Sequence, residues 1–245
     1  MSNTEPYGSL LKYAPKDGLI LDAGCGYFNY KKFLEKYNNK IVCLDIFNYD
    51  TEEARKSDFL LASVENLPFK DGSFDFIYCL SVIQLIEDDG RVINEFYRVL
   101  KNGGKLLFTV PTKRSVFRLL RDLEILLGVY KYPEYNVKHY HYYTRRDIHK
   151  LVENKFNIID LRGYGYNFLS RLLIFLISIF RLECVMVIIK NLLKRKLKRT
   201  IPSIKKANNK LDNLLTYLQH RFKFLNDISY HYIVVLEKMK EERSI

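Results

Sequence analysis

The chain has 245 residues, of which 48% are hydrophobic, and a formal net charge of +12. This length allows one large domain, or a core of about 165 residues with an addition, and the apolar content is enough for a substantial core. Cys25, Cys43, Cys79 and Cys184 show no CxxC spacing, which argues against a metal site or a disulfide framework and predicts buried reduced thiols. Residues 1–16 are polar and contain no signal-peptide core, so we expect a cytoplasmic protein.

The first motif is Leu-Asp-Ala-Gly-Cys-Gly at Leu21 to Gly26. It follows the apolar pair Leu19 and Ile20 and precedes a helical-looking segment, residues 30–37. A strand that ends in this way turns tightly, and a ligand can lie against the backbone where Gly24 and Gly26 lack side chains. The motif therefore predicts a nucleoside-like cofactor near the N-terminus.

The composition of the loop indicates which cofactor it binds. Asn29 stands where a dinucleotide fingerprint needs its third glycine. Asp22 would repel a phosphate but could accept hydrogen bonds from an amino group. A second predicted strand, residues 41–46, contains Asp45, whose carboxylate can accept both hydroxyls of a ribose. A ribose and an ammonium without a phosphate describe S-adenosylmethionine.

A longer stretch makes this interpretation more specific. Residues 63–75, Ser-Val-Glu-Asn-Leu-Pro-Phe-Lys-Asp-Gly-Ser-Phe-Asp, resemble the segment before the fourth strand of class I S-adenosylmethionine-dependent methyltransferases of the small-molecule type. The likeness continues through a fourth strand (76–80), a helix (89–100), a turn (101–104) and a fifth strand (105–110). The resemblance covers residues 18–112 and implies an α/β fold with a doubly wound, mostly parallel, seven-stranded sheet.

The resemblance also implies the cofactor site, although three residues depart from the family pattern. Ser63 stands where many relatives have an aspartate, Leu85 where they often have a histidine, and Asn102 where proline is usual. A hydroxyl at Ser63 can still form hydrogen bonds, whereas the change at Leu85 removes one possible base. The residues expected to bind the cofactor are Asp22, Gly24, Cys25, Gly26, Asp45, Ile46, Ser63, Val64, Glu65 and Leu80.

The region after the fifth strand is expected to cover the substrate, as in methyltransferases of this type. A predicted helix (114–127) precedes a tyrosine-rich stretch (129–143) that contains His139 and His141. Neutral imidazole can accept a proton near pH 7, so both are candidate catalytic bases, although local hydrogen bonding would explain them equally well.

Two strands and an insertion complete the predicted chain. Thr144 and Asp147 form a capping-box pattern for a helix at 145–154, and strands are expected at 156–161 and 230–236. We therefore divide the chain into a cofactor-binding core (1–163), a large helical, basic insertion (164–227), and the final strand with a C-terminal tail (228–245).

The charge is concentrated in this insertion. Residues 1–110 have 13 Lys and Arg against 16 Asp and Glu, a net charge of −3, whereas residues 190–223 have 11 basic residues and one Asp, a net charge of +10. The apolar block at 168–189 is interrupted by Arg171, Arg181 and Glu183, so it should not cross a bilayer. We interpret residues 168–206 as an element that lies on an anionic membrane surface, with a lid over the active site as the alternative.

Three classes of function are compatible with these features. The first is methyl transfer to a small, amphiphilic or lipid-linked acceptor at a membrane surface. The second class, a nucleic-acid methyltransferase, is disfavoured because the sequence contains no recognisable base-stacking module and no Asn/Asp-Pro-Pro-Tyr/Phe motif. The third class is a non-catalytic module that retains the fold and binds the cofactor. Measured turnover would separate the first class from the third.

Overall fold

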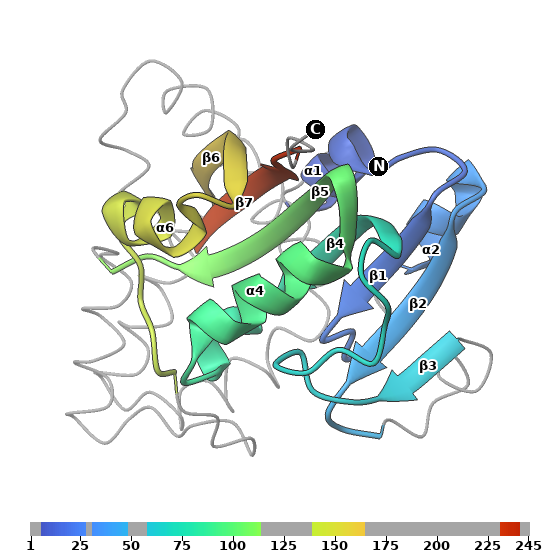
Figure 1. Ribbon diagram of the computed structural model, residues 1–245, viewed down its shortest axis with the longest axis horizontal. Coiled ribbons are helices and arrows are strands. Elements are labelled where there is room, and N and C mark those ends of the chain that lie inside the picture. The colour runs from blue at the N-terminus through green and yellow to red at the C-terminus, as the bar shows by residue number, and fades with distance from the viewer. Residues whose placement is uncertain (1–5, 28–30, 49–57, 114–138, 165–230, 241–245) are drawn as a thin grey trace, which may run out of the picture. The chain divides into compact units, whose positions relative to one another are not determined.

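The described strands form one seven-stranded sheet (Figure 1). The computed structural model describes residues 6–27, 31–48, 58–113, 139–164 and 231–240. The strands lie in the order β3-β2-β1-β4-β5-β7-β6. Their bounds are β1 (Leu19–Ala23), β2 (Lys40–Asp45), β3 (Asp58–Leu61), β4 (Phe74–Leu80), β5 (Leu100–Pro111), β6 (Phe156–Tyr164) and β7 (His231–Lys238).

The first five strands pair in parallel, whereas β7 runs in the opposite direction. β1 lies between β2 and β4, and Asp22 pairs with Cys43 on one side and with Tyr78 on the other. At the end of β7, Met239 N donates to the carbonyl of Lys155, directly before β6, and Lys238 Nζ donates to the carbonyl of Leu100 at the start of β5. The end of β7 therefore lies at the beginnings of both neighbours, as antiparallel pairing requires.

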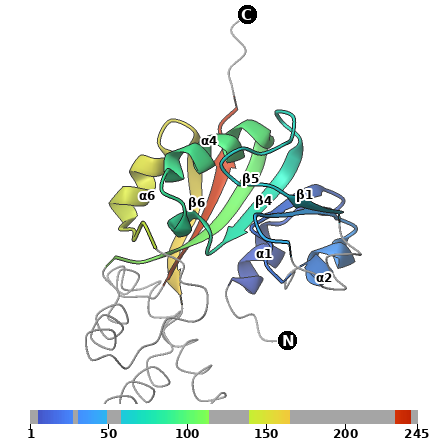
Figure 2. The same ribbon diagram turned by 90° about the horizontal axis from the view of Figure 1, so that it is seen from below.

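Helices lie on both sides of the sheet (Figures 1 and 2). One side carries α4 (Asp89–Val99) and α6 (Arg145–Val152), and α1 (Tyr7–Tyr13) lies on the other. Two short elements follow β1 along the chain, α2 (Lys31–Leu34) and the 3-10 turn η1 (Glu35–Tyr37), and a second 3-10 turn, η2 (Ile83–Leu85), follows β4. Parallel strands with helices on both faces bury the sheet on both faces, which explains why β1 and β4 are nearly continuous apolar runs.

The core on the α4 side unites strands and helices from distant parts of the chain. Val92, Ile93, Phe96 and Val99 recur at helical spacing and are fully buried against the sheet. Asp88 begins this helix, since its side chain accepts a hydrogen bond from Arg91 N at 2.9 Å. The helix thus begins at a capped residue in the loop after β4 and ends directly before β5.

Most of the predicted elements in the described residues are present, with different bounds. The capping box of Thr144 and Asp147 is confirmed, but the helix ends at Val152, because Asn154 adopts a left-handed conformation with φ of 62°. The strand predicted from Lys105 begins at Leu100, and its pairing with β4 is irregular there, since Phe74 pairs with Leu100 and Phe76 with Lys105. α1 and β3 were not predicted from the residue pattern.

Other predictions lie outside the described residues. These are the helix at 114–127, residues 129–138 of the tyrosine-rich stretch, Cys184 and the segment 168–206. The proposed division into core, insertion and final strand therefore stays a prediction. Two compact units are distinguished, one of residues 1–111, 138–162 and 232–245 and the other of residues 112–137 and 163–231, and the site described below lies in the first. Within the described part of the chain, no helix combines the length and apolar character needed to span a membrane.

Candidate active site

The loop after β1 holds two glycines in left-handed conformations. Gly24 has a φ of 79° and Gly26 a φ of 50°, values that other residues rarely adopt. A Cβ atom at Gly24 would lie 2.3 Å from Val82 Cγ2, so this glycine also allows the loop after β4 to approach β1. A Cβ atom at Gly26 would meet no atom of the described residues within 4 Å, so these residues leave open space beside the loop. The two glycines thus have different roles, close packing at Gly24 and an open cradle at Gly26.

Asp45 closes this loop from the end of β2. One carboxylate oxygen, Oδ2, accepts a hydrogen bond from Gly26 N at 3.0 Å, and the other, Oδ1, accepts one from Phe47 N at 3.0 Å. A carboxylate offers about four acceptor positions, so both oxygens keep capacity for a ligand. Ile46 and Phe47, which follow directly, expose 56% and 53% of their surface and provide an apolar face beside the carboxylate. This arrangement fits a ribose with an attached base.

Asp22 lies deeper, at the end of β1, with 4% of its surface exposed. Burial raises the pKa of its carboxyl to about 7; the Tyr78 hydroxyl opposes this increase, and the nearby Asp45 carboxylate adds to it. Contact with the Cys43 thiol, together with burial, raises the pKa of the Cys25 thiol, which therefore stays protonated. Cys25, Cys43 and Cys79 are buried free thiols, as the sequence predicts. The Asp22 carboxyl at the end of β1 is thus buried and titrates near neutral pH.

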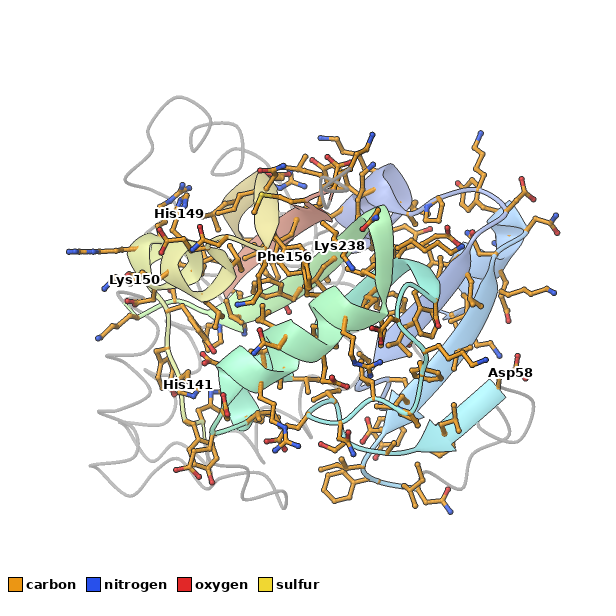
Figure 3. The ribbon with its side chains drawn as sticks, in the orientation of Figure 1. Asp58, His141, His149, Lys150, Phe156 and Lys238 are labelled. Carbon is orange, nitrogen blue, oxygen red and sulfur yellow. The ribbon has the colours of Figure 1, made fainter. Side chains whose placement is uncertain are left out.

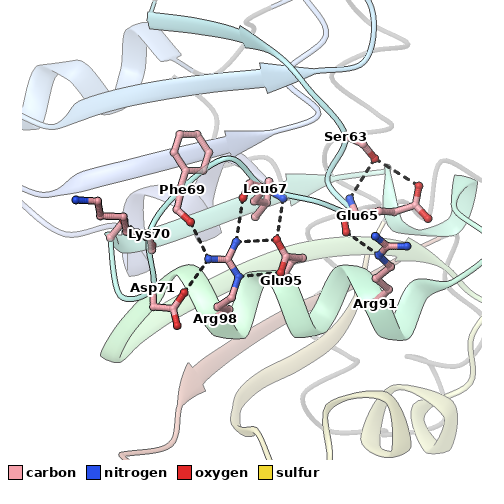
Figure 4. Close-up of polar contacts among 10 residues, drawn as sticks. Ser63, Glu65, Leu67, Phe69, Lys70, Asp71, Arg91, Glu95 and Arg98 are labelled. Atoms are coloured by element: carbon pink, nitrogen blue, oxygen red, sulfur yellow. Dashed lines mark hydrogen bonds and ion pairs between the residues drawn. The ribbon is translucent and has the colours of Figure 1, made fainter.

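The segment before β4 is held by one arginine of α4 (Figure 4). Arg98 forms a two-point ion pair with Glu95, with both distances at 2.8 Å, and donates to the carbonyls of Leu67 and Phe69 and to the Asp71 carboxylate. Glu95 accepts in turn from Leu67 N at 2.7 Å. Two-point pairs of this kind fix geometry better than single contacts. The motif between residues 63 and 75 is therefore fixed to the helix that follows it.

The start of this segment lies at the end of β2. Ala62 N donates to the carbonyl of Asp45, which brings Ser63 to the same edge of the sheet as the Asp45 carboxylate. Ser63 Oγ accepts from Glu65 N at 3.2 Å and lies 3.4 Å from Glu65 Oε2, while Arg91 Nε donates to the Glu65 carbonyl (Figure 4). The hydroxyl that replaces the family's usual aspartate is thus bound within its own turn.

The loop after β4 connects this site to the histidine segment. Val82 contacts Gly24, and two residues later the carbonyl of Gln84 accepts hydrogen bonds from Tyr140 N at 2.9 Å and His141 N at 3.4 Å. His141 Nε2 lies 2.9 Å from the carbonyl oxygen of Glu87, beside the start of α4 (Figure 3). The structure therefore brings His141 to the loop after β4, which also contacts Gly24, although His141 and Gly24 are more than a hundred residues apart in sequence.

Three further polar residues at the end of β4 were missed by the sequence prediction. Ser81 has a φ of 59°, a strained conformation that its backbone hydrogen bond to Thr109 Oγ1 at 2.9 Å helps to hold. The Tyr78 hydroxyl and Gln84 Oε1 are buried, and no group in the described residues forms a hydrogen bond of standard geometry with either. The sequence feature that could have indicated them is the presence of polar side chains in an otherwise apolar run, residues 74–86.

Comparison with known proteins identifies the family. A protein-family model described as a methyltransferase domain matches residues 21–108. A protein of Encephalitozoon cuniculi, whose name describes it as a methyltransferase, is 30% identical over 159 residues, which cover 60% of this chain and 74% of that protein. The chain belongs to the class I S-adenosylmethionine-dependent methyltransferases. The fold of the chain is similar to that of a SAM-dependent methyltransferase from Methanosarcina mazei, with a TM-score of 0.60 at 16% identity over 95% of this chain and 98% of that one.

The similarity in sequence does not cover the whole chain. The malonyl-[acyl-carrier protein] O-methyltransferase of Yersinia pestis is 30% identical over 105 residues, which cover 41% of this chain and 39% of that protein. The chain thus spans less than half the length of this curated relative. The family model ends at residue 108 and includes the glycine loop, Asp45 and the end of β4, but neither His139 nor His141.

Proposed function

We propose that the chain transfers the methyl group of S-adenosylmethionine to a small acceptor. The observation that carries this proposal is the Asp45 carboxylate, held by Gly26 N and Phe47 N at the edge of an open glycine loop. In this arrangement Asp45 would accept the ribose hydroxyls, Asp22 would face the ammonium, and Ile46 would contact the base. Cys25, Ser63, Val64, Glu65 and Leu80 complete the proposed cofactor site.

The bound cofactor supplies a methyl group that its sulfonium already activates. The protein then has to hold the acceptor in line with this methyl group and exclude water, and positioning of this kind can contribute several kcal/mol. An acceptor with a hydroxyl nucleophile also needs a base. We assign this role to His141 rather than to His139, because a hydrogen bond to the Glu87 carbonyl defines the tautomer of His141. A carbonyl oxygen can only accept, so this hydrogen bond requires the proton on Nε2. In a neutral imidazole, Nδ1 then carries the lone pair.

Isothermal titration calorimetry with S-adenosylhomocysteine and NAD tests the cofactor assignment. We expect binding of the former and weak or no binding of the latter, because the loop lacks a third glycine and has an acidic residue at its start. Tight binding of NAD with no binding of S-adenosylhomocysteine would overturn the assignment. Cofactor binding without methyl transfer to any acceptor would support the non-catalytic class.

Replacing His141 with Gln tests the base. The Gln amide can still donate to the Glu87 carbonyl but cannot accept a proton near pH 7. We expect the rate of S-adenosylhomocysteine formation with a hydroxyl acceptor to fall by about 10²- to 10⁴-fold, with unchanged cofactor affinity. The matched variant His139→Gln should keep most of the rate. Full activity and an unchanged pH profile in His141→Gln would exclude this histidine as the base.

An amphiphilic or lipid-linked acceptor at a membrane surface is the finer part of the proposal. The charge distribution supports it, because residues 190–223 carry a net charge of +10 and lie next to the most apolar stretch of the chain. Sedimentation with anionic vesicles at low salt, and release as salt screens the contact, would support it. Failure to sediment with these vesicles at low salt would favour a lid and an acceptor that is not membrane-bound.

A further inference from the structure

Asp22 and Tyr78 are direct neighbours in the sheet, on β1 and β4. The two residues form a register pair between parallel strands, so their side chains emerge on the same face. Asp22 is 4% exposed and Tyr78 is fully buried. The pair lies one residue before the end of β1 and two residues before the end of β4, directly below the glycine loop.

A phenol is an unusual group at this position, because the rest of the buried interior of β4 is apolar apart from a thiol. Buried hydroxyls are nearly always paired, and one without a partner needs an explanation. The Tyr78 hydroxyl is buried and outside standard hydrogen-bond geometry with the described residues, yet it acts on Asp22 and lowers the pKa of that carboxyl. The carboxyl of its register partner Asp22 is the acceptor to which this phenol can donate.

The other groups around Asp22 disfavour its charge. Burial and the Asp45 carboxylate from β2 both raise its pKa. The Cys25 and Cys79 thiols also lie close, and burial contributes to raising the pKa of both, so neither brings a charge at neutral pH. Cys43 adds a further thiol from β2, and no cation is among the groups that act on Asp22 in the described residues. Tyr78 is therefore the group in this set that favours the carboxylate.

We propose that Tyr78 is a positioning residue of the cofactor site, whose hydroxyl donates to Asp22 and holds it as a carboxylate facing the ammonium of bound S-adenosylmethionine. The inference rests on the proposed function. Tyr78 acts through Asp22 and does not itself contact the ligand. If the phenol had only a structural role, its removal would affect the fold and every part of the cofactor site equally.

The variant Tyr78→Phe removes only the hydroxyl, and two ligands distinguish the roles. S-adenosylhomocysteine has the ammonium, whereas 5′-methylthioadenosine has the same nucleoside without it. Calorimetry at about pH 7 should show an affinity for S-adenosylhomocysteine roughly 5- to 10-fold lower in the variant, and an unchanged affinity for methylthioadenosine. Phe76→Leu, two residues earlier on β4 and therefore on the same face, is the control and should not change the ratio of the two affinities.

The pH dependence gives a second measurement. Affinity for S-adenosylhomocysteine should fall as the pH drops below about 7, where Asp22 becomes protonated, and this acid limb should move to higher pH in Tyr78→Phe. At alkaline pH the affinity falls because the ligand ammonium loses its proton, and this part of the profile should not move in Tyr78→Phe. Equal losses for both ligands, or an acid limb that does not move, would overturn the inference. Binding of neither ligand by the unaltered protein would contradict the proposed function itself. This result is obtained without the variant, so the two failures can be distinguished.

Discussion

Replacing Asp22 with Asn should stabilise the free protein at neutral pH while it weakens cofactor binding. The pKa of Asp22 rises from 3.8 to about 7 on folding, so the native state binds more protons than the unfolded state between these values. The free energy of unfolding therefore falls as the pH rises through this range, by at most about 4 kcal/mol for this group. Asn has nearly the same shape and no charge, so it avoids this cost.

Thermal unfolding of both proteins at about pH 5 and about pH 8 would measure this effect, and the gain should be larger at the higher pH. Calorimetry should show about 10- to 100-fold weaker binding of S-adenosylhomocysteine in Asp22→Asn, since a hydrogen bond to a charged group contributes about 1.5–3 kcal/mol.

Asp75 provides a control of opposite sign. Burial alone would raise its pKa, but hydrogen bonds from Lys101 Nζ and Leu19 N bring it below its ordinary value. The Asp75 carboxylate thus stabilises the fold above its ordinary pKa, and this contribution is lost as the pH falls. Asp75→Asn should accordingly destabilise the protein at about pH 8 and leave the cofactor affinity unchanged. A loss of stability at about pH 8 in Asp22→Asn would contradict the first prediction.

Gly24→Ala should destabilise the protein far more than Gly26→Ala. At Gly24 a methyl group would lie 2.3 Å from Val82 Cγ2, and the backbone has a φ of 79°. The left-handed backbone costs about 1–2 kcal/mol and the overlap about 1–3 kcal/mol, a total of about 2–5 kcal/mol. At Gly26 the backbone cost applies without the overlap, because no atom of the described residues lies within 4 Å of the added Cβ. Urea unfolding monitored by circular dichroism would measure both values.

A second substitution separates the two terms. Gly24→Ala combined with Val82→Ala should recover the part of the loss that is due to overlap, after correction for Val82→Ala alone, and leave the backbone part. Similar losses at Gly24 and Gly26, or no recovery in the double variant, would show that Val82 does not constrain the loop.

Local patterns predicted the parts of the fold that depend on nearby residues. The tight turn after β1 depends on glycines within a few positions, and the start of α6 on Thr144 and Asp147, three residues apart. The family resemblance, which draws on a longer stretch, predicted a mostly parallel, seven-stranded sheet, and this is confirmed. The polar segment at residues 7–13 has a weak apolar pattern, and its helix is held by long-range contacts such as Tyr13 to Asp160.

The site was only partly predictable for the same reason. Asp22 and Asp45 were identified by their position at strand ends, but the pairing of Asp22 with Tyr78 depends on the register of strands more than fifty residues apart. The contact of His141 with Glu87 likewise joins segments separated by 54 positions. Neither pairing is encoded in a local motif. The roles assigned to these residues in binding and catalysis stay predictions until the variants are measured.

The placement of β7 constrains the order in which the chain can fold. The strands from β1 to β5 lie within the first 111 residues, and each can pair as soon as it leaves the ribosome. β6 cannot join the sheet in this way, because the place next to β5 belongs to a strand at 231–238. The buried residues Tyr232, Val234 and Leu236 and the contact of Lys238 with Leu100 all arrive with that strand. During synthesis, the exposed edge of β5 therefore stays open to other strands, and a chaperone that shields it would have to act until residue 238 emerges.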